Sequence, residues 1–234
     1  MRENPDLPPN SKESPIRFAR AALLCACLGF PLTVWAQPQV TLLDRQTLTA
    51  ADLGTPAAPT HRLHLTLVRL EATGWTRERT IAVVREAAPI LAQCGVALAR
   101  AELVTLSVSP RYLDFSTPAA GALARAYPTP RPAIYFVRDT RSRPAFDAEA
   151  IGRGNSRTRP ELADTVWITV ATRDPGVALA HELAHVLMDS GEHSEAPGNL
   201  MRDETAARNT ALTAAQCARL RDTASANGLL ETAK

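Results

Sequence analysis

The sequence carries no marked excess of charge of either sign. Lys and Arg together number 26 and Asp and Glu 24, which leaves a formal net charge of +2 over 234 residues. A protein that binds nucleic acid or an anionic membrane through its overall field needs a clear positive excess, so the composition supports neither partner. Lysine is nearly absent, at Lys12 and Lys234 only, and almost all the positive charge is arginine.

A long uninterrupted apolar run is also lacking. The best candidate runs from Ala21 to Ala36 and is broken by Pro31, whereas a transmembrane helix needs about 20 apolar residues. Two arginines precede the run, and small residues suited to the −3 and −1 positions of a cleavage site, Val34 and Ala36, end it. These features favour a secretory signal peptide over a membrane anchor, with cleavage before Gln37.

We therefore predict three segments. Residues 1–36 form a signal peptide, whose recognisable part covers about 17–36. Residues 37–60, rich in Thr, Ala and Pro, form a poorly ordered leader, and residues 61–234 form a single domain. A lipid anchor at Cys27 is a less favoured alternative. The mature chain is expected to be secreted or periplasmic, without a membrane span.

Cysteine is scarce, and cleavage would leave only Cys94 and Cys217 of the four cysteines. Export implies an oxidising compartment, in which two remaining thiols tend to pair. We therefore predict a Cys94–Cys217 disulfide, the alternative being two separate buried thiols.

Hydrophobic periodicity predicts a mixed α/β or α+β domain. The Arg-rich stretch 138–160 includes acidic residues, which favours a solvated loop over a nucleic-acid surface, with an edge strand around 151–154. The predicted strands cover 61–70, 96–108, 133–137 and 165–170, and the predicted helices begin at Thr76, Thr117, Asp174 and Thr213.

The segment His181-Glu182-Leu183-Ala184-His185 carries the chemistry. Residues four apart on a helix share one face, so the two imidazoles can reach one metal ion. Glu182 flanks that ion and is placed to accept a proton from a water molecule on it. Random placement would produce this pattern about 0.006 times in such a chain, and the helix is otherwise apolar, where solvated histidines would be out of place.

Two protein ligands are too few, because catalytic zinc usually takes three and a water. His193 is the best third candidate, since a left-handed turn at Gly191 could end the helix and fold the chain back. Asp189, Glu192 and Glu195 remain alternatives that could each supply a carboxylate oxygen.

The segment from His181 to Met201 resembles the zinc-binding region of the metzincin clan of metallopeptidases. That pattern is His-Glu-x-x-His-x-x-Gly-x-x-His followed by a methionine turn, and Asn199-Leu200-Met201 resembles the turn. Met201 would then pack beneath the metal as a floor. The family's glycine position is occupied here by Met188, and the third histidine comes two residues later than in the family.

The resemblance implies a single metzincin-like domain, with a twisted, mainly parallel sheet, an active-site helix and a C-terminal helix. It implies a Zn²⁺-dependent metallopeptidase, acting as an endopeptidase on a peptide or protein substrate, with His181, His185 and His193 on the metal and Glu182 as general base. An edge strand near 149–156 would hold the substrate. We expect a monomer that binds no nucleic acid.

A non-proteolytic zinc-binding envelope protein of zincin-like fold is the alternative function, since the motif by itself does not separate the two. A purely structural zinc site is disfavoured, because such sites close all four positions with Cys or His. Tyr112, Tyr127 and the Arg-rich stretch are candidates for stabilising an oxyanion.

Overall fold

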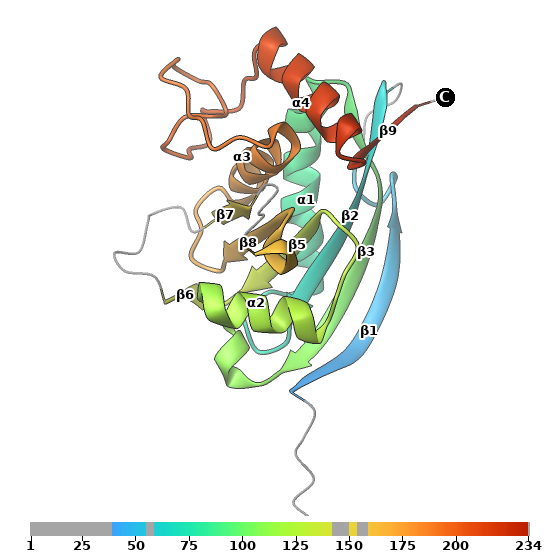
Figure 1. Ribbon diagram of the computed structural model, residues 1–234, viewed down its shortest axis with the longest axis vertical. Helices are drawn as coiled ribbons and strands as arrows, with labels where there is room; N and C mark the ends of the chain where they lie inside the picture. The colour runs from blue at the N-terminus through green and yellow to red at the C-terminus, as the bar shows by residue number, and fades with distance from the viewer. Residues whose placement is uncertain (1–38, 55–58, 142–149, 154–158, 234) are drawn as a thin grey trace, which may run out of the picture. The chain divides into compact units, whose positions relative to one another are not determined.

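The computed structural model describes residues 39–54, 59–141, 150–153 and 159–233 (Figure 1). The chain divides into Met1–Gln37, which lies outside the described residues together with the predicted signal peptide, and Pro38–Lys234. In chain order the elements of the second unit are β1 (Val40–Thr49), β2 (His61–Leu70), α1 (Arg77–Ala92), β3 (Val96–Val108), the 3-10 turn η1 (Pro110–Tyr112), β4 (Asp114–Phe115), α2 (Thr117–Ala126), β5 (Ala133–Val137), β6 (Asp139–Thr140), β7 (Ala150–Arg153), the 3-10 turn η2 (Pro160–Leu162), β8 (Thr165–Thr169), α3 (Pro175–Met188), α4 (Ala214–Ala226) and β9 (Leu230–Thr232).

A mixed sheet with the strand order β1-β3-β2-β5-β8-β7 forms the centre of this unit. Strands β3, β2, β5 and β8 run parallel to one another, whereas β1 pairs antiparallel with β3 and β7 antiparallel with β8 at the two ends of the order. Strand β9 pairs antiparallel with the beginning of β2. The predicted fold class, a mixed α/β domain with a mainly parallel sheet, is confirmed.

Helices cover both faces of the sheet (Figure 1). On one face α1, α3 and α4 pack on side chains such as Ile134 and Phe136. On the other face α2 and η1 pack on a second core that contains Tyr135 and Trp167. Because β5 is covered on both sides, all five of its residues are buried, which explains its uninterrupted apolar sequence.

Most predicted elements form where periodicity places them. The hydroxyls of Thr76 and Thr213 cap α1 and α4 by accepting from the backbone N–H three residues on. Asp174 is different, because it adopts a left-handed conformation with φ 47° and its side chain makes no capping hydrogen bond to α3. The predicted capping role of Asp174 is therefore wrong.

The prediction of a poorly ordered leader is wrong for residues 40–49. These residues form β1, which pairs with β3 along its length through a register shift between Leu42 and Asp44. Only Leu48 of this strand is buried, and the rest is partly or fully exposed. An edge strand with so little burial has no alternation of apolar and polar residues, so periodicity could not reveal it.

Close packing against α1 sets the position of α3. A Cβ atom at Gly176 would lie 2.2 Å from the Cβ atom of Glu86 on α1 and 3.2 Å from the carbonyl oxygen of Val83. Only glycine permits this approach, which fixes the first turn of α3 against α1. Among the described helices, none combines the length and apolar content that crossing a bilayer requires.

The predicted disulfide is present. It joins Cys94, just beyond α1, to Cys217 on α4, over a sequence separation of 123 residues. Both cysteines are buried in the core that also contains α3. The bond therefore holds α4 against the end of α1.

Replacing both cysteines by alanine should lower the free energy of unfolding by about 3–5 kcal/mol, because an unfolded chain without this long loop gains conformational entropy. Denaturant melts of the oxidised wild type and the double variant measure the difference. Adding a reductant should destabilise the wild type and leave the variant unchanged. Equal stability of the two oxidised proteins would contradict the prediction.

Candidate metal centre

The two motif histidines project from the second half of α3. His181 is buried, with 3% of its surface exposed, and His185 is half-buried. Their rings meet edge to face, with centroids 4.5 Å apart. The predicted helical spacing therefore does place both imidazoles on one face.

Backbone carbonyls determine which nitrogen of each ring carries its hydrogen. The Nδ1–H of His181 donates to the carbonyl oxygen of Leu200 at 2.7 Å, and the Nδ1–H of His185 donates to that of Ser190 at 2.6 Å. A carbonyl can only accept, so we assign the hydrogen of each neutral ring to Nδ1. Each Nε2 is then left with a free lone pair, as a metal ligand requires.

The Nε2 atoms converge on one point. That of His185 lies 2.9 Å from Nε2 of His181 and 3.2 Å from Nε2 of His193. Burial lowers the pKa of His181, and burial with the neighbouring His181 lowers the pKa of His185 to about 4. Both rings are therefore neutral at pH 7, and two lone pairs face each other with no hydrogen between them, an arrangement that a cation would stabilise.

His193 comes from the loop after α3, and its side chain is 37% exposed. Its Nδ1 lies 3.4 Å from a carboxylate oxygen of Asp203, and its Nε2 faces Nε2 of His185. The backbone N–H of Ser194 donates to the carbonyl oxygen of Met201 at 2.7 Å and holds the loop against the following turn.

That turn contains Asn199, Leu200 and Met201, all buried. The side-chain oxygen of Asn199 accepts from the backbone N–H of Met201 at 3.0 Å, and the N–H of Leu200 donates to the carbonyl oxygen of Ala211 at 2.7 Å. The turn over residues 199–201 is thus a hydrogen-bonded unit, and it supplies the carbonyl that orients His181.

The structure does not support Asp189, Glu192 or Glu195 as the third ligand. Among the described residues, the group able to hold a metal ion contains His181, His185 and His193, and no carboxylate. The residue that ends α3 in a left-handed conformation is Asp189, with φ 45°, so the turn predicted at Gly191 is wrong. The sequence did not predict that Ser190 and Asp203 would lie against the histidine rings, because their spacing from the histidines follows no recognisable pattern.

The tyrosines considered for oxyanion stabilisation lie elsewhere. Tyr112 and Tyr127 belong to the core on the α2 face of the sheet, opposite to the face that α3 covers. Tyr127 accepts a hydrogen bond from Arg45 on β1. The rest of the Arg-rich stretch is described only in part, since residues 142–149 and 154–158 lie outside the described residues.

Glu182 is half-buried and follows His181 directly on α3, about 100° further around the helix. Strand β7 pairs with β8 at one end of the sheet and lies beside α3. The edge segment predicted at 151–154 is therefore a strand over Ala150–Arg153, and residue 154 lies outside the described residues.

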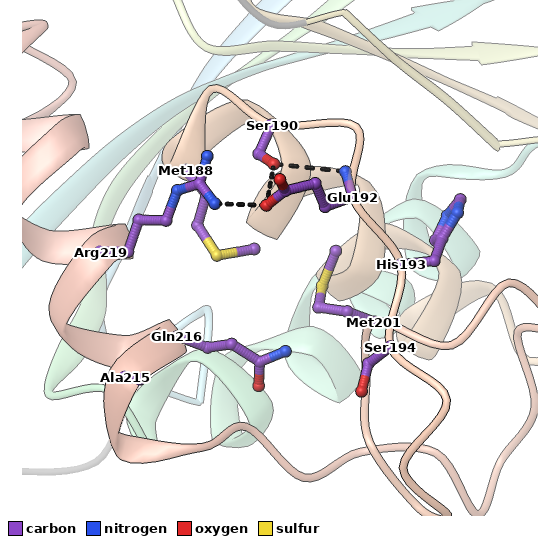
Figure 2. Close-up of a pocket in the computed structure, with 9 residues that line it drawn as sticks. All are labelled: Met188, Ser190, Glu192, His193, Ser194, Met201, Ala215, Gln216 and Arg219. Carbon is purple, nitrogen blue, oxygen red and sulfur yellow. Dashed lines mark hydrogen bonds and ion pairs between the residues drawn. The ribbon is translucent and has the colours of Figure 1, made fainter.

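A pocket of about 340 Å³ adjoins the metal centre on the side of α4 (Figure 2). Its lining comes from the end of α3, the following loop, the methionine turn and α4: Met188, Ser190, Glu192, His193, Ser194, Met201, Ala215, Gln216 and Arg219. In Figure 2 the ring of His193 lies at the far edge, beyond Met201. His181 and His185 do not line the pocket, so it is separate from the point where the three Nε2 atoms meet.

The donor set fits a first-row transition metal. Two nitrogens bound tetrahedrally at about 2.0–2.1 Å lie about 3.3 Å apart, close to the observed 2.9 and 3.2 Å. Neutral imidazoles suit zinc, copper, iron and nickel, whereas calcium and magnesium prefer oxygen ligands. Three protein ligands would leave a coordination position open, as catalytic sites require.

No protein-family model and no curated protein matches the chain. Its fold is similar to the crystal structure of metalloproteinase-II from Bacteroides fragilis, with 18% sequence identity and a TM-score of 0.50. The match covers 72% of this chain and 55% of that protein, so the chain spans about half the length of its structural neighbour. At this identity the likeness is one of fold.

Replacing His193 by alanine should weaken metal binding by about 100-fold or more, since loss of an outer partner alone typically costs 10–100-fold. Competition with a chromophoric chelator measures the affinity. His64→Ala removes an exposed histidine on β2 that lies beside Glu231 and does not belong to the metal-binding group, and it is the matched control. Equal affinities of the two variants would show that His193 is not a ligand.

Proposed function

We propose that the chain is an exported zinc-dependent metallopeptidase that cleaves peptide bonds internally, with Glu182 as the general base. The observation that carries the proposal is the convergence of the Nε2 atoms of His181, His185 and His193, with Glu182 next to His181 on α3. The ring tautomers of His181 and His185 support it, because carbonyl acceptors on Nδ1 are the partners that metal-bound histidines require. The fold likeness to a metalloproteinase is consistent with it.

The proposed reaction is hydrolysis, in which water adds to the scissile carbonyl carbon and the carbon–nitrogen bond breaks. Zinc, when bound, polarises that carbonyl and lowers the pKa of a water molecule toward about 7. Glu182 accepts the proton of this water and passes it to the nitrogen of the leaving amine, which departs neutral. His181 and His185 keep their lone pairs directed inward through their Nδ1 partners, and a carboxylate oxygen of Asp203 lies 3.4 Å from Nδ1 of His193.

Substrate binding is proposed to use the edge of β7. This strand ends the described sheet order and pairs on one side with β8. The opposite backbone edge offers a ladder to which an extended peptide can add. Because β7 lies beside α3, a peptide bound there would lie close to the helix that carries His181 and His185.

Export is proposed from the N-terminal signal features at residues 1–36. The Cys94–Cys217 disulfide is compatible with it, since structural disulfides persist in oxidising compartments and are rare in the cytosol.

Replacing Glu182 by glutamine should keep zinc bound and lower kcat by about 10²–10⁴-fold, because the amide cannot accept a proton. Digestion of a peptide library followed by mass spectrometry identifies a cleaved peptide, on which kcat and zinc content are then measured. Removal of zinc with a chelator should abolish cleavage, and added zinc should restore it.

Glu195→Gln is the matched control. Glu195 is an exposed carboxylate on the loop that carries His193 and lies outside the metal-binding group, so this variant should retain activity. Undiminished kcat in Glu182→Gln would disprove the role of Glu182. A wild-type protein that binds zinc but cleaves no peptide would instead favour the non-proteolytic zinc-binding protein of similar fold.

A further inference from the structure

The C-terminal helix α4 contacts the metal-binding loop through two side chains on one face. Gln216 and Arg219 are three residues apart, so they lie on adjacent turns of the same side of α4. Gln216 contacts Asn199 in the methionine turn, and Arg219 contacts Glu192 next to His193. One helix face thus reaches both segments that orient the histidines.

The contact between Gln216 and Asn199 is a reciprocal amide pair. The Nδ2 of Asn199 donates to Oε1 of Gln216 at 2.9 Å, and the Nε2 of Gln216 donates to Oδ1 of Asn199 at 3.0 Å. Backbone donors fix both amide orientations, since the N–H of Met201 needs Oδ1 and the N–H of Thr213 needs Oε1. Neither amide can turn over without losing a backbone partner.

This pair is connected directly to His181. Asn199 precedes Leu200, whose carbonyl oxygen accepts from Nδ1 of His181. Asn199 is buried, with 4% of its surface exposed. Moving Asn199 would therefore move the carbonyl that sets the tautomer and direction of the His181 ring.

The second contact is an ion pair beside His193. The Nη1 atom of Arg219 donates to Oε2 of Glu192 at 2.6 Å, and Ser190 donates its hydroxyl to the same carboxylate oxygen at 3.3 Å. Glu192 immediately precedes His193, and Ser190 supplies the carbonyl that accepts from His185. The loop that is two residues longer than the metzincin pattern is thus joined to α4 next to His193.

A hollow lies between the two contacts. The pocket of about 340 Å³ has Gln216, Arg219, Met188 and Met201 among its lining. In Figure 2 the Arg219–Glu192 pair lies along one side of it and Gln216 along the opposite side. Across this space the ion pair of Arg219 and Glu192 connects the loop to α4.

Helix α4 is itself held in place at the residue next to Gln216. Cys217 forms the disulfide to Cys94, and Thr213 and Gln216 form a capping box at the helix start. Leu220 is buried in the core shared with α3. A helix fixed in this way provides a rigid reference for the loop.

We propose that α4 positions the metal ligands, with Gln216 holding the carbonyl partner of His181 and Arg219 holding the loop that carries His193. Both are positioning residues, because neither side chain belongs to the metal-binding group. The proposal rests on the metal-binding part of the proposed function and is independent of peptide hydrolysis.

The first test exchanges the charges of the ion pair. Arg219→Glu should weaken zinc binding by about three- to tenfold, since two carboxylates repel each other and displace the loop. Added negative charge by itself would favour a dication, so a loss of affinity reports displacement of ligands. The Glu192→Arg/Arg219→Glu double variant restores the pair in reverse and should recover most of the affinity.

Chelator competition on the full oxidised chain measures zinc affinity, and thermal melts of the zinc-free proteins measure folding. Visible absorption of the cobalt(II)-loaded proteins reports the ligand geometry. It should change in Arg219→Glu and return toward the wild-type spectrum in the double variant. Arg125→Glu is the control. It breaks the ion pair between Arg125 on α2 and Glu161, remote from the loop, and it should bind zinc as the wild type does.

Gln216→Glu is a second, independent variant. Its retained oxygen still accepts from the Thr213 N–H and keeps the capping box, but the other oxygen now faces the acceptor Oδ1 of Asn199. Zinc affinity should fall about tenfold. Gln46→Glu places the same change on β1 beside Arg77, far along the chain from the loop, as a control for added charge.

Zinc affinities within twofold of the wild type in both Arg219→Glu and Gln216→Glu would overturn the proposal. A lower melting temperature of the zinc-free variants with unchanged affinity and cobalt spectrum would also overturn it, since α4 would then have only a structural role. If Arg219→Glu does not fold, the zinc affinity, melting temperature and cobalt spectrum of Arg219→Gln and Gln216→Glu test the proposal instead. A wild type without zinc affinity would instead disprove the proposed function.

Discussion

Two hydrogen bonds from ring nitrogens to backbone carbonyls govern the chemistry available to α3. The carbonyls of Leu200 and Ser190 hold the hydrogens of His181 and His185 on Nδ1. If either hydrogen moved to Nε2, that ring would present an N–H where a ligand lone pair is needed. The ability of the site to hold a metal thus depends on where two peptide groups outside the helix lie.

The position of those peptide groups depends on the rest of the fold. Leu200 belongs to a buried turn bonded to Ala211 and, through Asn199, to α4. Helix α4 is joined by the disulfide to the end of α1, and α1 packs on α3 at Gly176. The connections therefore form a closed circuit that runs from α3 to the turn, from the turn to α4, from α4 to α1 and from α1 back to α3. This circuit limits how far any one ligand can move.

Local sequence signals predicted the elements that are buried or capped. β5 and β3 are apolar because the sheet is covered there, and Thr76 and Thr213 carry the capping signal in their own side chains. Periodicity did not predict β1, because nearly all of this strand faces solvent and its pairing with β3 joins residues far apart in sequence. The capping role predicted for Asp174 was wrong, because aspartate is common both as a helix cap and in the left-handed backbone conformation that Asp174 adopts.

The sequence by itself determined the pair His181 and His185 with Glu182 between them, because helical spacing is a local property. It also nominated His193 and the Cys94–Cys217 pair. Only the tertiary structure brings His193 next to the pair, in a group that could hold a metal ion and that, within the described part of the chain, includes no carboxylate. It also decided which carbonyls orient the rings, and that Gln216 and Arg219 reach the loop. These contacts join residues on separate elements, so no spacing in the sequence could encode them.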